Sequence, residues 1–181
     1  MKNEKLKPPP RSPVGGVLGD GRLKSNAMKT QQNSSPRGEV GRGLPLGIRN
    51  NNPLNIRKVP GTHWKGEIPQ STPPLGGDGG GLFVRFETME WGIRAALKLL
   101  RTYRDKYAAT SIKEIITRWA PPTENKTDDY IAAVCRLTSF GGNERLTEKE
   151  WPALIKAMAV VESRLLISDE TIAAAKELLN Q

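Results

Sequence analysis

Apolar residues recur every three or four positions through the second half of the chain, and this spacing predicts amphipathic helices. The clearest is residues 90–106, whose inner face consists of Ile93, Ala96, Leu97, Leu100 and Tyr103. Four more are predicted: residues 112–119 behind the N-cap Ser111, residues 127–137, and two that begin at the caps Thr147 and Ser168 and end at Ser163 and Leu179. The pattern therefore predicts about five helices.

A strand pattern precedes these helices. Residues 82–87 alternate in the way of a short strand, and Trp64-Lys65-Gly66 lies on the other side of the glycine- and proline-rich stretch 69–81. The two flanks predict a small β-hairpin with a long tip. The predicted fold class is thus mainly α (α+β), in one domain over residues 46–181, which is an ordinary size for a domain.

Residues 1–45 differ from this domain in composition. They hold six prolines, seven glycines and few apolar residues, which show no helical or strand period. They also carry nine Lys or Arg against three Asp or Glu, so that six of the nine net positive charges lie there. Such a segment buries too little apolar surface to offset its ordering entropy. We therefore predict a disordered, basic, Pro/Gly-rich tail.

The sequence favours neither a membrane span nor a classical export signal. No run approaches the roughly 18 apolar residues of a spanning helix, and Pro8 to Pro10 interrupt the N-terminal region where a signal peptide would lie. We expect a protein made in the cytoplasm without a classical signal peptide. Nucleic acid is an unlikely partner, because the basic tail lacks aromatic interleaving and a recognised binding fold.

Several chemistries are disfavoured by residue counts. Cys135 is the single cysteine, which excludes an internal disulfide, and its place in an apolar helical pattern favours a buried thiol over a nucleophile. His63, the single histidine, argues against a His-rich metal site and against a Ser/His/Asp triad. We therefore expect no metal and no cofactor.

The domain opens with the motif GIRNNNPLNIR, in which residues 50–53 predict a turn. Two interpretations of its asparagines stay open. The side chains of Asn51, Asn52 and Asn55 either satisfy backbone groups in an irregular loop or form a polar wall for a ligand.

A family resemblance follows from the order of motifs. The runs NNNPLNI, WKG, VRFETMEWGIRAALKLL, RWAPPTEN and TDDYIAAV, within residues 47–137, resemble a phage-borne peptidoglycan-degrading or virion-structural family of the lysozyme-like superfamily. Their order is also similar to that of the glucosaminidase family, in which a catalytic Glu followed by Ser precedes the Asn-Asn turn. Here the run IKAMAVVES, residues 155–163, has that character at the other end of the chain. The resemblance therefore implies a circularly permuted, lysozyme-like domain with Glu162 as the catalytic acid.

Cleavage of a glycosidic bond at neutral pH needs a carboxylic acid whose pKa is raised by apolar surroundings. Leu154, Met158 and Glu162 lie four residues apart on one predicted helical face, so the carboxyl is expected at the edge of an apolar stripe. A solvated charge or an ion pair is the alternative. Glu87 is a weaker second candidate, because a helix N-terminal charge also explains it.

The predicted partner is the peptidoglycan glycan strand, cleaved by hydrolysis or lytic transglycosylation at the cell wall or in a phage particle. Asn51, Asn52, Asn55, Trp64 and Tyr130 are the candidate substrate-binding residues, with core packing as the alternative for Tyr130. The competing hypothesis is a non-catalytic virion or cell-wall-binding protein on the same scaffold. The sequence Ser163-Arg164-Leu165 after the acid, where the phage family has glycine, and the long stretch 69–81 both favour that alternative.

Overall fold

The computed structural model describes residues 44–69, 81–123 and 125–181. Within these ranges the chain forms six helices: α1 (Leu46–Arg49), α2 (Met89–Tyr107), α3 (Ile112–Trp119), α4 (Thr127–Thr138), α5 (Trp151–Ser163) and α6 (Asp169–Leu179). The mainly α fold is confirmed. The predicted tail, apart from its last two residues, and most of the stretch 69–81 lie outside the described residues.

The five predicted helices correspond to α2 to α6, and their inner faces explain why they fold. On α2 the five residues of the predicted apolar stripe are all buried. Ser111 caps α3 in a reciprocal capping box with Glu114, and the Ser168 hydroxyl accepts from the Thr171 N–H at the start of α6. The helix α1 was not predicted, because four residues are too few for a period to be seen.

Two details of the predicted helices are wrong. Thr147 does not cap α5: it exchanges hydrogen bonds with Glu150 in the turn before the helix, and Glu150 itself is the N-cap. Leu137, expected on the inner face of α4, is 52% exposed. Its helix ends one residue later at Thr138, and the C-cap Ser139 adopts a left-handed conformation, so this last turn lies beyond the packed face.

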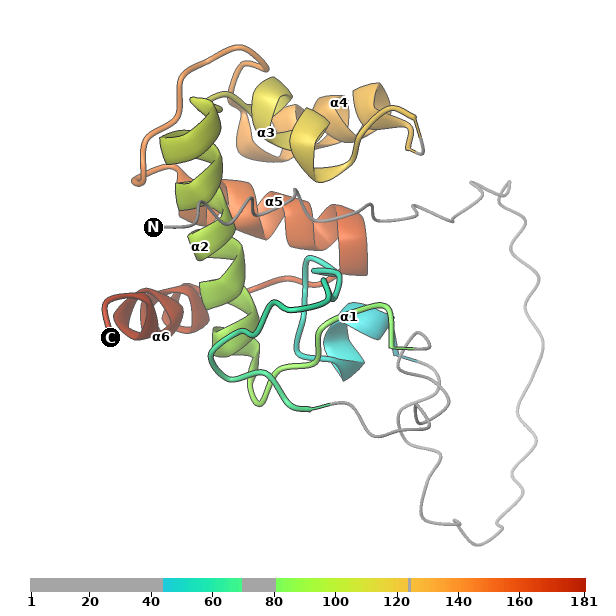
Figure 1. Cartoon of the computed structure of the whole chain (residues 1–181). Helices are drawn as coiled ribbons and strands as arrows, with labels where there is room; N and C mark the ends of the chain where they lie inside the picture. Colours follow the sequence, from blue (N-terminus) through green and yellow to red (C-terminus); the bar gives the residue numbers. More distant parts are fainter. Residues whose placement is uncertain (1–43, 70–80, 124) are drawn as a thin grey trace, which may run out of the picture.

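The helices surround α2, which stands upright in Figure 1 with α3 and α4 at its upper end. α6 packs most extensively against α2, and α5 contacts α1, α2 and α4. The core includes four fully buried residues of α5, namely Leu154, Ile155, Met158 and Ala159. Burial of the three larger side chains contributes about 1.5 to 3 kcal/mol each. α5 is thus fixed along its length, and its C-terminal end lies beside α1 (Figure 1).

The predicted β-hairpin is not formed as a regular hairpin. Within the described part of the chain there are isolated antiparallel bridges instead, Arg57 to Phe83 and Glu67 to Phe86. The reason is that residues 82–87 pair with two different segments. Val84 N–H donates to Ile56 O, whereas Glu87 N–H donates to Gly66 O, each at 2.9 Å. The pairing partner changes midway, so neither ladder extends.

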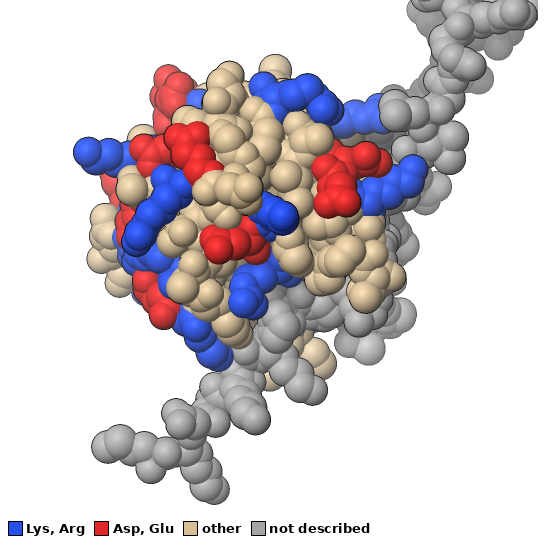
Figure 2. Space-filling view, turned by 90° about the horizontal axis from the view of Figure 1, so that it is seen from above, with Lys and Arg blue, Asp and Glu red and all other residues tan. Residues whose placement is uncertain are grey.

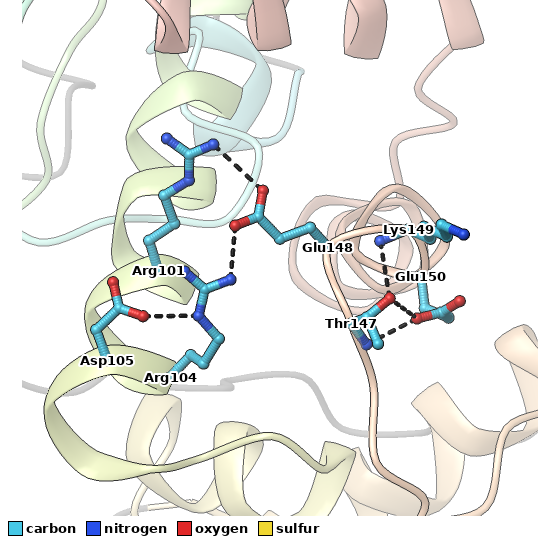
Figure 3. Close-up of polar contacts among 7 residues, drawn as sticks. All are labelled: Arg101, Arg104, Asp105, Thr147, Glu148, Lys149 and Glu150. Atoms are coloured by element: carbon cyan, nitrogen blue, oxygen red, sulfur yellow. Dashed lines mark hydrogen bonds and ion pairs between the residues drawn. The ribbon is translucent and has the colours of Figure 1, made fainter.

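A polar network joins α2 to the turn before α5 (Figure 3). The Glu148 carboxylate accepts from Arg104 Nη1 at 2.6 Å and from Arg101 Nη2 at 3.2 Å, and Asp105 also pairs with Arg104. On the face seen in Figure 2, acidic and basic side chains are interspersed among uncharged ones. Among the helices described, none is long and apolar enough to cross a membrane.

Candidate functional site

The candidate site begins with Glu162, in the last turn of α5. The four fully buried residues that precede it on the helix direct the inner face of α5 into the core. Glu162 follows Met158 by four residues and therefore continues the same face to its end. Its side chain is only partly exposed. The Glu162 side chain therefore lies at the edge of the apolar face of α5, as predicted from the sequence.

Two side chains from distant parts of the chain bind this carboxyl. The Tyr130 hydroxyl of α4 donates to Oε1 at 3.1 Å, and the Asn55 side-chain amide, from the loop after α1, donates to Oε2 at 3.3 Å. Both oxygens of Glu162 thus have a neutral donor. Tyr130 is also a core residue, because it is buried within the hydrophobic core.

The electrostatics of the site follow from this enclosure. Burial raises the pKa of the Glu162 carboxyl, while the hydrogen bonds from Asn55 and then Tyr130 act in the opposite direction. The Trp119 indole N–H acts in that direction too, but more weakly, since its nitrogen makes no hydrogen bond of standard geometry. Burial also raises the pKa of Tyr130 well above its usual range, so its hydroxyl stays neutral and remains a donor.

A residue that the sequence interpretation did not assign to the site, Ser163, fixes the end of α5. Its buried hydroxyl donates to Pro53 O at 2.8 Å. Gly47 of α1 lies so close that a Cβ at this position would overlap Ser163 Oγ. Consecutive residues of α5, Glu162 and Ser163, therefore both bond to the loop that carries Asn55. The Glu-Ser pair was the available signal for this role.

The structure places Asn51 and Asn52 in backbone contacts. The Asn52 side chain is fully buried: its amide donates to Ile56 O and Val84 O, and its oxygen accepts from Ile56 N–H. The Asn51 amide donates to the carbonyls of Phe86 and Glu87. For these two residues the observed bonds match the loop-satisfying interpretation, whereas the Asn55 side chain reaches Glu162.

Two further candidates make no hydrogen bond to Glu162 within the described chain. Trp64 is partly buried and packs against the core, and its backbone N–H donates to the Glu67 side chain at 3.0 Å. Glu87 is exposed, and its backbone groups bond to Gly66 and to Asn51. Neither residue is brought to the acid by a direct polar contact.

In the ranges that the structure describes, no group of three or more His, Cys, Asp or Glu residues could hold a metal ion. His63 is exposed and Cys135 is partly buried. The polar groups gathered at Glu162 are thus a carboxyl, an amide and a hydroxyl. Together they can hold one acidic proton at a partly exposed position.

No protein-family model matches the chain. A comparison with curated proteins found Protein P5 of Pseudoalteromonas phage PM2, which is 42% identical over 119 residues. The match covers 65% of this chain and 70% of the phage protein. At this identity and coverage, the two proteins share a common fold and origin. The chain therefore belongs to the family of Protein P5 of phage PM2.

Proposed function

We propose that the protein cleaves the glycan strands of peptidoglycan, with Glu162 as general acid and then general base. The observation that carries the proposal is the Glu162 carboxyl itself: partly exposed, at the end of an apolar helix, held by Asn55 and Tyr130, and with a pKa raised by burial. A general acid needs a pKa near the working pH, and enclosure by apolar residues is how proteins raise that of a carboxyl.

The proposed reaction uses one proton twice. The protonated Glu162 gives its proton to the glycosidic oxygen as the bond from that oxygen to the anomeric carbon breaks. The carboxylate then takes a proton from the hydroxyl that attacks the anomeric carbon. This hydroxyl belongs to water in a hydrolase, or to the sugar itself in a lytic transglycosylase. Either route returns Glu162 to its protonated state.

The chemistry requires that the glycan reach Glu162 from its exposed side. Trp64, in the segment between α1 and α2 that also carries Asn55, is the proposed aromatic contact for the sugar, with Tyr130 beside the carboxyl. The family relationship to a phage protein supports a place of action in a phage particle or at the wall of a phage host.

The test is clearance of turbidity from purified cell walls by wild type, Glu162→Gln and Glu87→Gln. We expect wild type to clear the walls and Glu162→Gln to lose at least about a hundredfold in rate, as removal of a general acid does. Glu87→Gln tests the weaker catalytic candidate, and because this side chain is exposed and makes no hydrogen bond to Glu162 among the described residues, the variant should keep most of the rate. A wild-type protein that never clears walls would end the enzyme proposal.

The second candidate is a non-catalytic virion or wall-binding protein on the same scaffold. It is favoured by the use of Asn51 and Asn52 in backbone contacts, which leaves fewer amides for a substrate. The two candidates separate in a sedimentation assay with the same walls. Binding that survives Glu162→Gln, combined with no clearance by wild type, supports the second.

A further inference from the structure

We infer that Asn55 is a positioning residue, which holds the Glu162 carboxyl in one orientation and regulates how tightly it keeps its proton. This inference rests on the proposed role of Glu162 and reassigns Asn55 from substrate binding to the acid itself. Three features of the molecule support it: the contact, the backbone that presents it, and the chemistry of the amide.

The contact joins residues 107 positions apart in the sequence. It is reinforced by the next residue of α5, because Ser163 Oγ donates at 2.8 Å to the carbonyl of Pro53, which lies two residues before Asn55. Two bonds between the same pair of segments restrict rotation of the loop relative to α5. The surrounding fold therefore holds the loop so that the Asn55 side chain faces Glu162 Oε2.

The backbone of Asn55 is in the left-handed region, with φ of 50°. Asparagine is among the few residues other than glycine that adopt this conformation readily. The loop is held there by Asn55 N–H donating to Asn52 O at 2.9 Å and by the three hydrogen bonds of the buried Asn52 side chain. The hydrogen bonds of the asparagine-rich motif thus set the direction in which the Asn55 amide points.

An amide suits both states of the acid. Asn55 Nδ2 donates to the ionised carboxylate, whereas Asn55 Oδ1 is buried and has no hydrogen-bond partner among the described residues. Rotation of the amide by half a turn would bring Oδ1 to Glu162, where it can accept the proton of the neutral carboxyl. Neither a hydrocarbon nor a carboxylate at this position provides both interactions.

The other groups that face the carboxyl come from α3 and α4. They are Trp119 and Tyr130, and within the described chain Tyr130 is the titratable one. Because Tyr130 stays neutral, the ionised state of Glu162 is stabilised there by neutral donors, of which Asn55 has the largest effect. In the structure it is Nδ2, and not Oδ1, that contacts the carboxyl, so loss of the Asn55 amide should favour the protonated state.

The experiment measures the titration of Glu162 by NMR in the full chain with carboxyl-labelled glutamate. The signal is assigned by its disappearance in Glu162→Gln. Asn55→Gly removes the amide and tolerates the positive φ. Asn51→Gly is the matched control, because Asn51 also has φ of 50° but its amide bonds to backbone carbonyls. Thermal melting verifies that each variant is folded.

We expect Asn55→Gly to shift the titration of Glu162 upward and Asn51→Gly to leave it in place. Asn55→Asp should shift it upward further, because a second carboxylate beside the first disfavours its ionisation. A midpoint that is unchanged or lowered in Asn55→Gly, or raised equally in Asn51→Gly, overturns the inference. If wild type clears no walls, the proposed function fails, yet this titration still decides the role of Asn55.

Discussion

The hydroxyl of Ser163 donates to the carbonyl of Pro53 at 2.8 Å and joins the end of α5 to the loop that follows α1. Both groups are buried, so the bond is not exchanged with water. Because Glu162 immediately precedes Ser163, this bond also sets the position of the candidate acid. The stability of the fold and the geometry of the site are thus connected at one residue.

Glu162→Gln is expected to be as stable as wild type at acidic pH and more stable at neutral pH. The folded protein binds the Glu162 proton more tightly than the unfolded chain does, because burial raises the pKa. Wild-type stability therefore falls as the pH rises from the unfolded pKa, about 4.3, to the higher folded one. Glutamine does not titrate and escapes this loss.

Thermal melts of both proteins at a series of pH values measure the difference. The gap in melting temperature should open as the pH rises through that window and then stay constant. A constant gap at all pH values would contradict the raised pKa. Glu87→Gln, at an exposed position, provides the background against which the gap is compared.

Gly47→Ala should destabilise the fold by about 1 to 3 kcal/mol, the usual cost of overpacking a tight contact. The new Cβ would overlap Ser163 Oγ and lie 2.9 Å from Asn52 O. Chemical denaturation measures the loss, and Gly61→Ala is a useful comparison. Gly61 has a positive φ but open space around it, so its variant reports backbone strain alone.

The overlap between a Cβ at position 47 and Ser163 Oγ leads to a second, more specific prediction. In the background of Ser163→Ala, where Oγ is absent, Gly47→Ala should cost less than in wild type, which a double-mutant cycle detects. Additive effects of the two substitutions would mean that α1 and α5 do not meet at this contact.

Asn52→Ala should cost about 3 kcal/mol or more in the free energy of unfolding. Three hydrogen bonds of 2.8 to 2.9 Å are lost from a fully buried side chain, and buried backbone groups are left without partners. Denaturant titration measures this loss. If Asn52 were instead a surface ligand contact, stability would scarcely change.

Much of the helical fold could be predicted because it depends on local periodicity. The bounds of α3 and the buried face of α2 follow from spacing and from capping chemistry at Ser111. The position of Glu162 at the edge of an apolar face follows from the same regularity. Tyr130 was predicted as a substrate contact, with core packing as the alternative, and the structure places it in the core with its hydroxyl on Glu162.

The remaining features depend on long-range geometry, which spacing does not encode. Within the asparagine turn, side-chain directions are set by the φ of each residue, so Asn55 could not be separated from Asn51 and Asn52. The two predicted flanks meet at the bridge from Glu67 to Phe86, but a regular hairpin does not form, because residues 82–87 change pairing partner midway and spacing does not reveal this. The contact of Gly47 with Ser163 likewise joins α1 to the C-terminal end of α5, which are far apart in the sequence.

The contact between Asn55 and Glu162 also makes this carboxyl a reporter of folding. It forms only when the loop after α1 and the C-terminal end of α5 have met, across 107 residues of sequence. Helices give a circular dichroism signal even in a loosely assembled intermediate, because their hydrogen bonds are local. The chemical shift of one labelled carboxyl would instead report when the loop after α1 contacts the end of α5. It would therefore distinguish a completed tertiary structure from secondary structure alone.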